Sequence, residues 1–312
     1  MAFRTKIWWW LLLSPVLPVK AQERADTAFE KTIFWSVSGN GLPRTSYLFG
    51  TAHPIFRDNI LLADTVLTAL LHSSAVYFER VPQASDDSLY REQCRMDRPK
   101  LRPLLGTACY DLLVKFLTEH QDSVLADPLF LHLSPQYYIT RLVKTAYGND
   151  LTTMDAFLAS IAIGNDQSVY ALDSPALQEE LVNRVSLQQQ ADNLYYILAD
   201  FEKRMKEYAY FIRRMTARYH EGDIGYLFTR TNYVRYTNRY TGFSYQLRQP
   251  SGEELLDKRN KEWLPVIEKA CQQGNCFFAF GAAHLAGSHG IINLLRKKGY
   301  TVTPVMLLRE KL

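Results

Sequence analysis

The chain of 312 residues contains only four cysteines, and no two of them have the C-x-x-C spacing, with two residues between them. Structural zinc sites usually pair their cysteines at that short spacing, so a zinc cluster built on these residues is not expected. The sequence also lacks low-complexity segments and an evident linker. Together with the length, this predicts one domain rather than several.

An apolar run long enough to span a membrane is also missing from the N-terminal part. The run IWWWLLLSPVLPV at 7–19 is shorter than the ~20 residues that a membrane-spanning helix needs. Two basic residues precede it, and Val19-Lys20-Ala21 follows, which is typical of a secretory signal peptide. We therefore expect residues 1–21 to be removed and the domain 22–312 to be exported, periplasmic or secreted, without stable membrane insertion. The alternative is an anchor that stays attached.

The chain has little net positive charge once this segment is removed. Residues 1–21 hold three of the 36 basic residues and none of the 32 acidic ones, so the remaining chain has a net charge of +1. No basic stripe or basic–aromatic cluster stands out in it. A nucleic-acid partner is therefore not expected.

The even number of cysteines favours disulfides in an exported protein. Four cysteines allow three pairings. The simplest pairing has two local bridges, Cys94–Cys109 and Cys271–Cys276, and this is the one we predict.

The periodicity of apolar residues predicts a mixed α/β fold. Runs rich in aromatic and β-branched residues predict strands at 32–38, 46–49, 75–80, 168–172, 276–280 and 300–305. Apolar residues at three- and four-residue steps predict helices at 59–71, 101–119, 135–146, 152–163, 252–272 and 288–298. The stretch 176–220 should form two long helices or one that bends, and 233–242 a solvated loop. We expect paired β/α units from both chain ends to form a central sheet, with a helical insertion between them.

One motif occurs twice. YLFGTAH and FAFGAAH place Gly50 and Gly281 after apolar runs, and His53 and His284 three residues later. Glycine permits backbone angles that other residues resist, so we expect a sharp turn after each strand. Sites in open α/β sheets form beyond the carboxyl ends of the strands, where both histidines would lie. A purely structural role is the alternative for each.

Glu79 ends another apolar run, AVYFE. A carboxylate there is costly unless something pairs with it. His53, Glu79 and His284 together form a ligand set that can hold a divalent metal and leave positions open for water. Glu79 would be a ligand or a general base. A salt bridge to Arg80 or Arg44 is the structural alternative.

Arg259, next to Asn260, is the second candidate catalytic residue beside Glu79. Its guanidinium is always charged and binds carboxylates as a fork. It could clamp Glu79, a substrate carboxylate or a developing oxyanion. A position on the surface of the predicted helix 252–272 is the alternative.

Several short motifs, in this order and spacing, resemble the TraB/GumN family, which is related to the Tiki metalloproteases. The motifs are LFGTAH (48–53), Glu79, MD (154–155), VYALDS (169–174), EGD (221–223), LDKRNKEW (256–263), GAAHL (281–285), Gly287, Gly290 and LLRKKGY (294–300). One departure is Leu172-Asp173-Ser174, where the family usually has Leu-Glu-Thr.

The resemblance implies a fold related to the erythromycin-esterase and ChaN-type proteins, with a site built from both histidine motifs and the strand glutamate. It also implies metal-dependent cleavage of a peptide or another small amide, with manganese or cobalt favoured and zinc possible. The competing functions are a peptide- or haem-binding protein without turnover and a metal-free hydrolase with a histidine base.

The expected processing can be tested on exported protein. Cleavage after Ala21 should give a chain that begins at Gln22, because the small residue follows a short apolar core. Mass spectrometry of the exported material measures this. A full-length chain that stays in membranes after carbonate extraction would contradict the prediction and favour the anchor.

Overall fold

The computed structural model describes residues 29–81, 86–174, 177, 185–233 and 256–307. The first elements are β1 (Phe34–Ser38), β2 (Ser46–Thr51), β3 (Ile55–Phe56), α2 (Asp64–Leu71), β4 (Ala75–Phe78), α3 (Asp86–Gln93), α4 (Leu101–Glu119), α5 (Pro135–Tyr147), β5 (Leu151–Thr152), α6 (Met154–Gly164) and β6 (Val169–Ala171). The later ones are α8 (Leu187–Leu198), α9 (Phe201–His220), α10 (Ile224–Tyr233), α11 (Lys258–Gln273), β7 (Cys276–Gly281), the 3₁₀ turn η5 (Ala282–His284), α12 (Ile291–Lys297) and β8 (Thr301–Pro304). The predicted signal segment 1–21 and residues 234–242 of the predicted loop lie outside the described residues.

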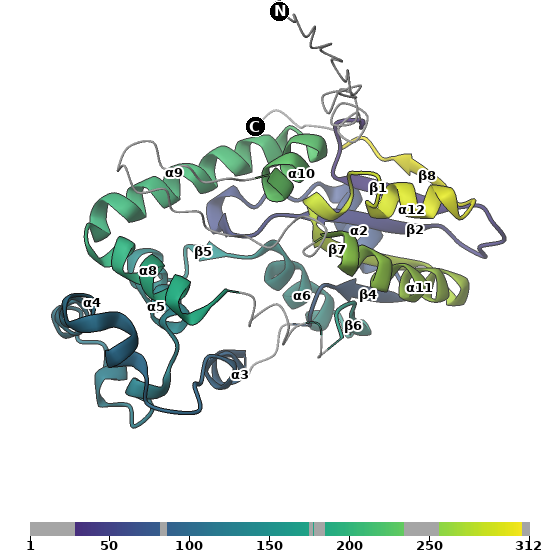
Figure 1. Ribbon diagram of the computed structural model, residues 1–312. Helices are drawn as coiled ribbons and strands as arrows, with labels where there is room; N and C mark the ends of the chain where they lie inside the picture. The colour runs from purple at the N-terminus through teal and green to yellow at the C-terminus, as the bar shows by residue number, and fades with distance from the viewer. Residues whose placement is uncertain (1–28, 82–85, 175–176, 178–184, 234–255, 308–312) are drawn as a thin grey trace, which may run out of the picture.

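A six-stranded sheet in the order β6-β4-β7-β2-β1-β8 organises the fold. Its inner pairs β2–β7, β7–β4 and β4–β6 are parallel, whereas β1 is antiparallel to both β2 and β8. Strands from the two ends of the chain therefore meet side by side at β2 and β7 (Figure 1). The predicted mixed α/β class is confirmed, and β6 joins this sheet from the middle of the chain.

The central strand β7 is buried along its whole length, CFFAFG. Successive side chains of a strand point to opposite faces of the sheet. Phe277 packs against Phe49 on one face, with ring centroids 5.9 Å apart. Phe280 packs on the other face against Trp263 of α11, at 5.6 Å. Burial on both faces explains why the strand is a continuous apolar run rather than an alternating one.

The predicted helical insertion forms a hydrophobic cluster of its own. Residues of α4, α5 and α8, such as Leu113, Tyr138 and Leu194, are fully buried against one another. Figure 1 shows these helices gathered to one side of the sheet, with α9 running from them toward the sheet. No helix in the described ranges is long and apolar enough to cross a membrane.

Two predicted helices differ in extent from the observed ones. The helix predicted from residue 59 begins only at Asp64. Residues 57–59 form a 3₁₀ turn, and Ile60 after it is extended, with φ −79° and ψ 105°, so the chain is not helical there. The Asn59 carbonyl oxygen accepts a hydrogen bond from His220 Nε2 at 3.0 Å. In the stretch 176–220 the chain bends at Ala199 and Asp200, between α8 and α9. Of the two predicted forms, two helices or one that bends, the described part shows two helices.

The predicted disulfides are not formed in the structure. All four cysteines are free and buried. The thiol of Cys276 donates a hydrogen bond to the Ala270 carbonyl oxygen at 3.5 Å, instead of bonding to Cys271. Burial raises the pKa of the Cys271 thiol to about 12 and that of Cys109 to about 11, so both groups stay protonated at neutral pH. Protonated thiols in an apolar core behave as small hydrophobic side chains.

Candidate functional site

The two glycine–histidine motifs lie at the same edge of the sheet. β2 and β7 are parallel neighbours, with Thr51 opposite Gly281. β4 lies on the other side of β7 and ends just before Glu79. The fold therefore brings His53, Glu79 and His284 from three distant segments to the carboxyl ends of adjacent strands.

Close packing, rather than an unusual turn, explains the two glycines. Gly281 has φ −49° and ψ 130°, and Gly50 is not among the residues with positive φ. The prediction of glycine-specific backbone angles is therefore wrong. A Cβ on Gly50 would lie 2.9 Å from the Cα of Ala282. A Cβ on Gly281 would lie 3.0 Å from His53 Nε2 and 3.1 Å from Glu79 Oε1, so this glycine leaves open the space that these two groups share.

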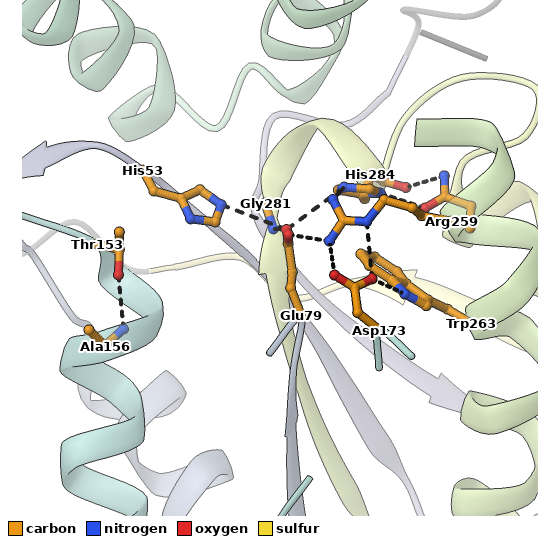
Figure 2. A network of polar contacts seen from close by, with 10 residues as sticks. His53, Glu79, Thr153, Ala156, Asp173, Arg259, Trp263, Gly281 and His284 are labelled. Carbon is orange, nitrogen blue, oxygen red and sulfur yellow. Dashed lines mark hydrogen bonds and ion pairs between the residues drawn. The ribbon is translucent and has the colours of Figure 1, made fainter. Parts of the chain in front are cut away.

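Glu79 lies at the centre of the polar network in Figure 2. Its Oε1 accepts a hydrogen bond from the Gly281 backbone N–H at 2.7 Å, and its Oε2 accepts one from Arg259 Nη2 at 2.5 Å. The same Oε1 lies 3.7 Å from His53 Nε2 and 3.7 Å from His284 Nε2. One carboxylate oxygen therefore faces both histidines, while the other is bound to arginine.

Arg259 is buried, with 7% of its surface exposed. Its Nε and Nη2 donate to the two carboxylate oxygens of Asp173 at 3.1 and 2.8 Å, and its Nη1 lies 3.2 Å from His284 Nε2. The guanidinium also lies over the ring of Trp263, 4.6 Å from its centroid. Of the roles considered for Arg259, the structure shows the clamp on Glu79. The helix-surface position is wrong.

Asn260 fixes the protonation of the His284 ring. Its amide nitrogen donates to the backbone carbonyl oxygens of His284 and His289, so its Oδ1 must accept. That oxygen lies 2.7 Å from His284 Nδ1, which therefore carries the proton. Burial, with the positive charge of Arg259, lowers the pKa of His284 to about 3. The imidazole is neutral, and the lone pair of its Nε2 faces Arg259 and Glu79.

A group of possible metal ligands contains an aspartate to which sequence reasoning gave no role, although it belongs to the motif MD (154–155). Ligand atoms of His53, Glu79 and Asp155 all lie within 4.8 Å of one another. Asp155 sits in the first turn of α6, whose N-cap Thr153 accepts a hydrogen bond from the Ala156 N–H at 3.2 Å (Figure 2). His284 Nε2 lies 3.7 Å from the same oxygen of Glu79, Oε1, but it also lies 3.2 Å from the positively charged guanidinium of Arg259.

Two buried oxygens beside this group, Asp155 Oδ1 and Thr51 Oγ1, make no hydrogen bond of good geometry with the described residues. The Thr51 hydroxyl nevertheless lies near enough to Asp155 to lower its pKa. A buried polar atom without a well-formed hydrogen bond is costly, and a bound water or ion is one way to satisfy it. A cation bound by Asp155 would satisfy the carboxylate oxygen. The residues present therefore fit a metal ion at this place.

The balance of charge leads to the same conclusion. The described cluster contains the carboxylates of Glu79, Asp155 and Asp173 but one guanidinium, that of Arg259. Burial raises the pKa of Asp155 to about 6, with His53 opposing the rise and Glu79 adding to it. Burial would also raise the pKa of Glu79, but Arg259 and the two histidines hold it well below its usual range. A divalent cation would balance the charge when all three carboxylates are ionised.

Sequence reasoning named His53, Glu79, His284 and Arg259, and the structure places all four in one network. It missed the role of Asp155, although an acid inside the apolar run MDAFLASIAIG was a signal. It also gave no role to Asp173 or Trp263, which are joined by a hydrogen bond of 2.9 Å from indole to carboxylate. Nothing in the local sequence links those two residues to Arg259.

Comparison with known proteins matches residues 33–304 to the model of the TraB/PrgY/gumN family. The chain belongs to this family. Among curated proteins it is similar to the metalloprotease TIKI2 of Danio rerio, with 38% identity over 53 residues. That match covers 16% of this chain and 10% of the relative, so most of both proteins lies outside it. No solved structure matches the chain.

The close approach at Gly50 gives a stability prediction. In Gly50→Ala the new methyl group would meet Ala282 and the Leu285 side chain at 2.9 and 2.8 Å. We expect a loss of about 1–3 kcal/mol in the free energy of unfolding, measured by urea denaturation. Gly164→Ala is the control, because nothing lies within 4 Å of its Cβ position. Equal stability of the two variants would contradict the close-packing explanation.

The buried carboxylate of Asp155 gives a second prediction. Its pKa in the folded protein, about 6, lies above the ordinary value of 3.8. Its contribution to stability is therefore fully present below pH 3.8 and is lost as the pH rises through about 6. At pH 8 the buried charge costs on the order of 3 kcal/mol in metal-free protein. Asp155→Asn removes this cost and should unfold at higher urea concentration than wild type.

The difference between the two proteins should shrink as the pH falls from 6 toward 4. The neutral His284 has the opposite dependence, since its lowered pKa makes stability fall below pH 6.5. That contribution is the same in both proteins and cancels in the comparison. An Asp155→Asn protein that is less stable than wild type by the same amount at pH 5 and pH 8 would contradict the buried charge.

Proposed function

We propose that this protein is a metal-dependent hydrolase that cleaves a peptide or a related amide bond. The observation that carries the proposal is the group of His53, Glu79 and Asp155, with ligand atoms within 4.8 Å of one another and an unpartnered oxygen on Asp155. Membership of the TraB/PrgY/gumN family and the partial similarity to a TIKI2 metalloprotease support the same reaction class.

The donor set favours manganese. Two carboxylates and one imidazole make an oxygen-rich site, and carboxylate ligands suit Mn²⁺ better than they suit Zn²⁺. Cobalt and zinc remain possible occupants, because imidazole binds both. When bound, the divalent ion would lower the pKa of a water molecule and polarise the carbonyl of a substrate.

The contacts of Glu79 support the role of a ligand over that of a general base. Both of its oxygens already accept strong hydrogen bonds, one from Gly281 and one from Arg259. Its pKa is held well below the usual range, mainly by Arg259 against the effect of burial, so it accepts a proton poorly. Oε1, which faces His53, is the oxygen that would bind the ion.

The other residues of the network orient this oxygen and close the inner side of the site. Arg259 holds Oε2 of Glu79, and its own position is fixed by buried partners. His284 is 3% exposed and closes the inner side of the site, whereas the His53 side chain is 29% exposed and lies toward solvent. A substrate would therefore enter past His53.

Export of this hydrolase to the periplasm or the exterior is part of the proposal. The composition of residues 1–21 supports it. The substrate would then be an extracellular or periplasmic peptide or small amide.

Ligand substitutions test the proposal. Wild type purified without a histidine tag should bind one Mn²⁺ per chain, as measured by elemental analysis and calorimetry. His53→Ala and Asp155→Asn should each weaken binding at least ~10-fold, because each removes a ligand. Cleavage of a peptide library by these variants should fall by ~10²-fold or more. His72→Ala removes an exposed histidine just after the C-terminal end of α2 and should change neither quantity.

Two results would overturn the proposal. One is wild type that binds no Mn²⁺, Co²⁺ or Zn²⁺ at micromolar concentration. The other is His53→Ala with the stoichiometry and cleavage rate of wild type. Metal binding without cleavage of any peptide or amide would favour a binding protein, and an absorbance band on titration with haem would identify that alternative.

A further inference from the structure

Asp173 contacts both the guanidinium of Arg259 and the indole of Trp263 (Figure 2). Asp173 follows β6 in the sequence. The hydrogen bonds between β4 and β6 continue beyond the ends of both strands, because the Asp173 backbone N–H donates to the Glu79 carbonyl oxygen at 2.9 Å. The two acidic residues are therefore backbone neighbours. Their carboxylates are both bound to the guanidinium of Arg259, which separates two like charges.

The bonds to Asp173 are complementary in shape as well as in charge. Its Oδ1 accepts from Arg259 Nε at 3.1 Å and from Trp263 Nε1 at 2.9 Å, and its Oδ2 accepts from Arg259 Nη2 at 2.8 Å. The Nε–Nη2 edge of the guanidinium is therefore used in a bidentate pair, the strongest form of this contact. Trp263 also lies under the guanidinium plane. Arg259 has one orientation that satisfies all these contacts.

That orientation decides which oxygen of Glu79 is available. With Asp173 in place, Arg259 reaches Glu79 through Nη2 alone and binds Oε2. Oε1 is left facing His53 at 3.7 Å. Without Asp173, the Nε–Nη2 edge would lose its carboxylate and could turn to form a bidentate pair with Glu79. Both oxygens of Glu79 would then be bound to a cation that competes with the metal.

We propose that Asp173 is a positioning residue of the metal centre, which holds Arg259 in a monodentate contact with Glu79 and so keeps the guanidinium away from Oε1, the oxygen that would bind the ion beside its hydrogen bond from Gly281. The inference rests on the proposed function for its metal. The geometry of Asp173, Arg259 and Trp263 on which it depends is that of the protein alone. Asp173 itself acts on the site through the arginine.

The chain contains a matched control for a buried aspartate–arginine pair. Asp122 receives bidentate hydrogen bonds from Arg141, and its side chain is 8% exposed, against 4% for Asp173. This pair joins α5 to the turn after α4, in the helical cluster outside the candidate site. Asp122→Asn therefore breaks the same kind of contact without touching the metal centre.

The experiment measures the affinity of metal-free, full-length protein for Mn²⁺ by calorimetry, with urea denaturation of every variant alongside. Asp173→Asn should bind Mn²⁺ about 10–100-fold more weakly, the usual effect of losing a group that orients a ligand. Asp173→Glu keeps the charge and should recover most of the affinity. Asp122→Asn should lose stability but keep the affinity of wild type.

A double-mutant cycle separates positioning from general damage. If Asp173 acts through Arg259, Asp173→Asn should have no further effect on Mn²⁺ affinity in an Arg259→Gln background. An equal effect in both backgrounds, or unchanged affinity in Asp173→Asn, overturns the inference. If Asp173→Asn does not fold, Trp263→Phe replaces it in the test. It removes one of the hydrogen bonds to Asp173, so unchanged affinity there also overturns the inference.

A readout without metal distinguishes failure of the inference from failure of the proposed function. Arg259 Nη1 lies 3.2 Å from the unprotonated Nε2 of His284, so the ¹⁵N signal of that nitrogen reports the position of the guanidinium. In metal-free protein, Asp173→Asn should shift this signal and Asp122→Asn should not. An unmoved signal overturns the inference even if wild type binds no metal. Absence of metal binding with a shifted signal overturns the proposed function and leaves the anchoring of Arg259 supported.

Discussion

The ion pair between Glu79 and Arg259 is the interaction on which the arrangement of the site depends. Both groups are largely removed from water, with exposed side-chain fractions of 14% and 8%. A buried charge is tolerated only when it is paired and its hydrogen bonds are satisfied. β4, the segment after β6, α11 and the turn after β7 therefore have to converge at one point, because each supplies a partner. Loss of any of them would leave a buried charge without compensation.

The parallel arrangement of the inner strands makes this convergence possible. Neighbouring parallel strands present their carboxyl ends at the same edge, where sites of α/β proteins commonly form. Gly50 then permits β2 and the 3₁₀ turn after β7 to approach closely, and Gly281 leaves space for His53 and Glu79. The cost of the arrangement is an excess of negative charge and an unpartnered oxygen on Asp155. Such locally unfavourable features are typical of binding sites, which give up stability for function.

Much of the fold could be read from local patterns. The run CFFAF predicted a strand at 276–280, and the apolar steps in 101–119 and 135–146 predicted helices of the second cluster. Predictions went wrong where a distant group intervened. The chain before α2 is extended at Ile60 and contacts the distant His220 through the Asn59 carbonyl, and all four thiols are free and buried. Spacing along the chain contains no information about such contacts.

The sequence alone determined the strands, the repeated glycine–histidine motif and the presence of a glutamate at a strand end. These follow from periodicity and composition, which are local properties of the chain. The tertiary structure decided that Asp155 joins His53 and Glu79, and that Arg259 is held by Asp173 and Glu79. These contacts depend on how segments up to 180 residues apart in the sequence pack together. They are fixed by burial, because an ionised group out of water must take as its partner whichever opposite charge the fold places within reach.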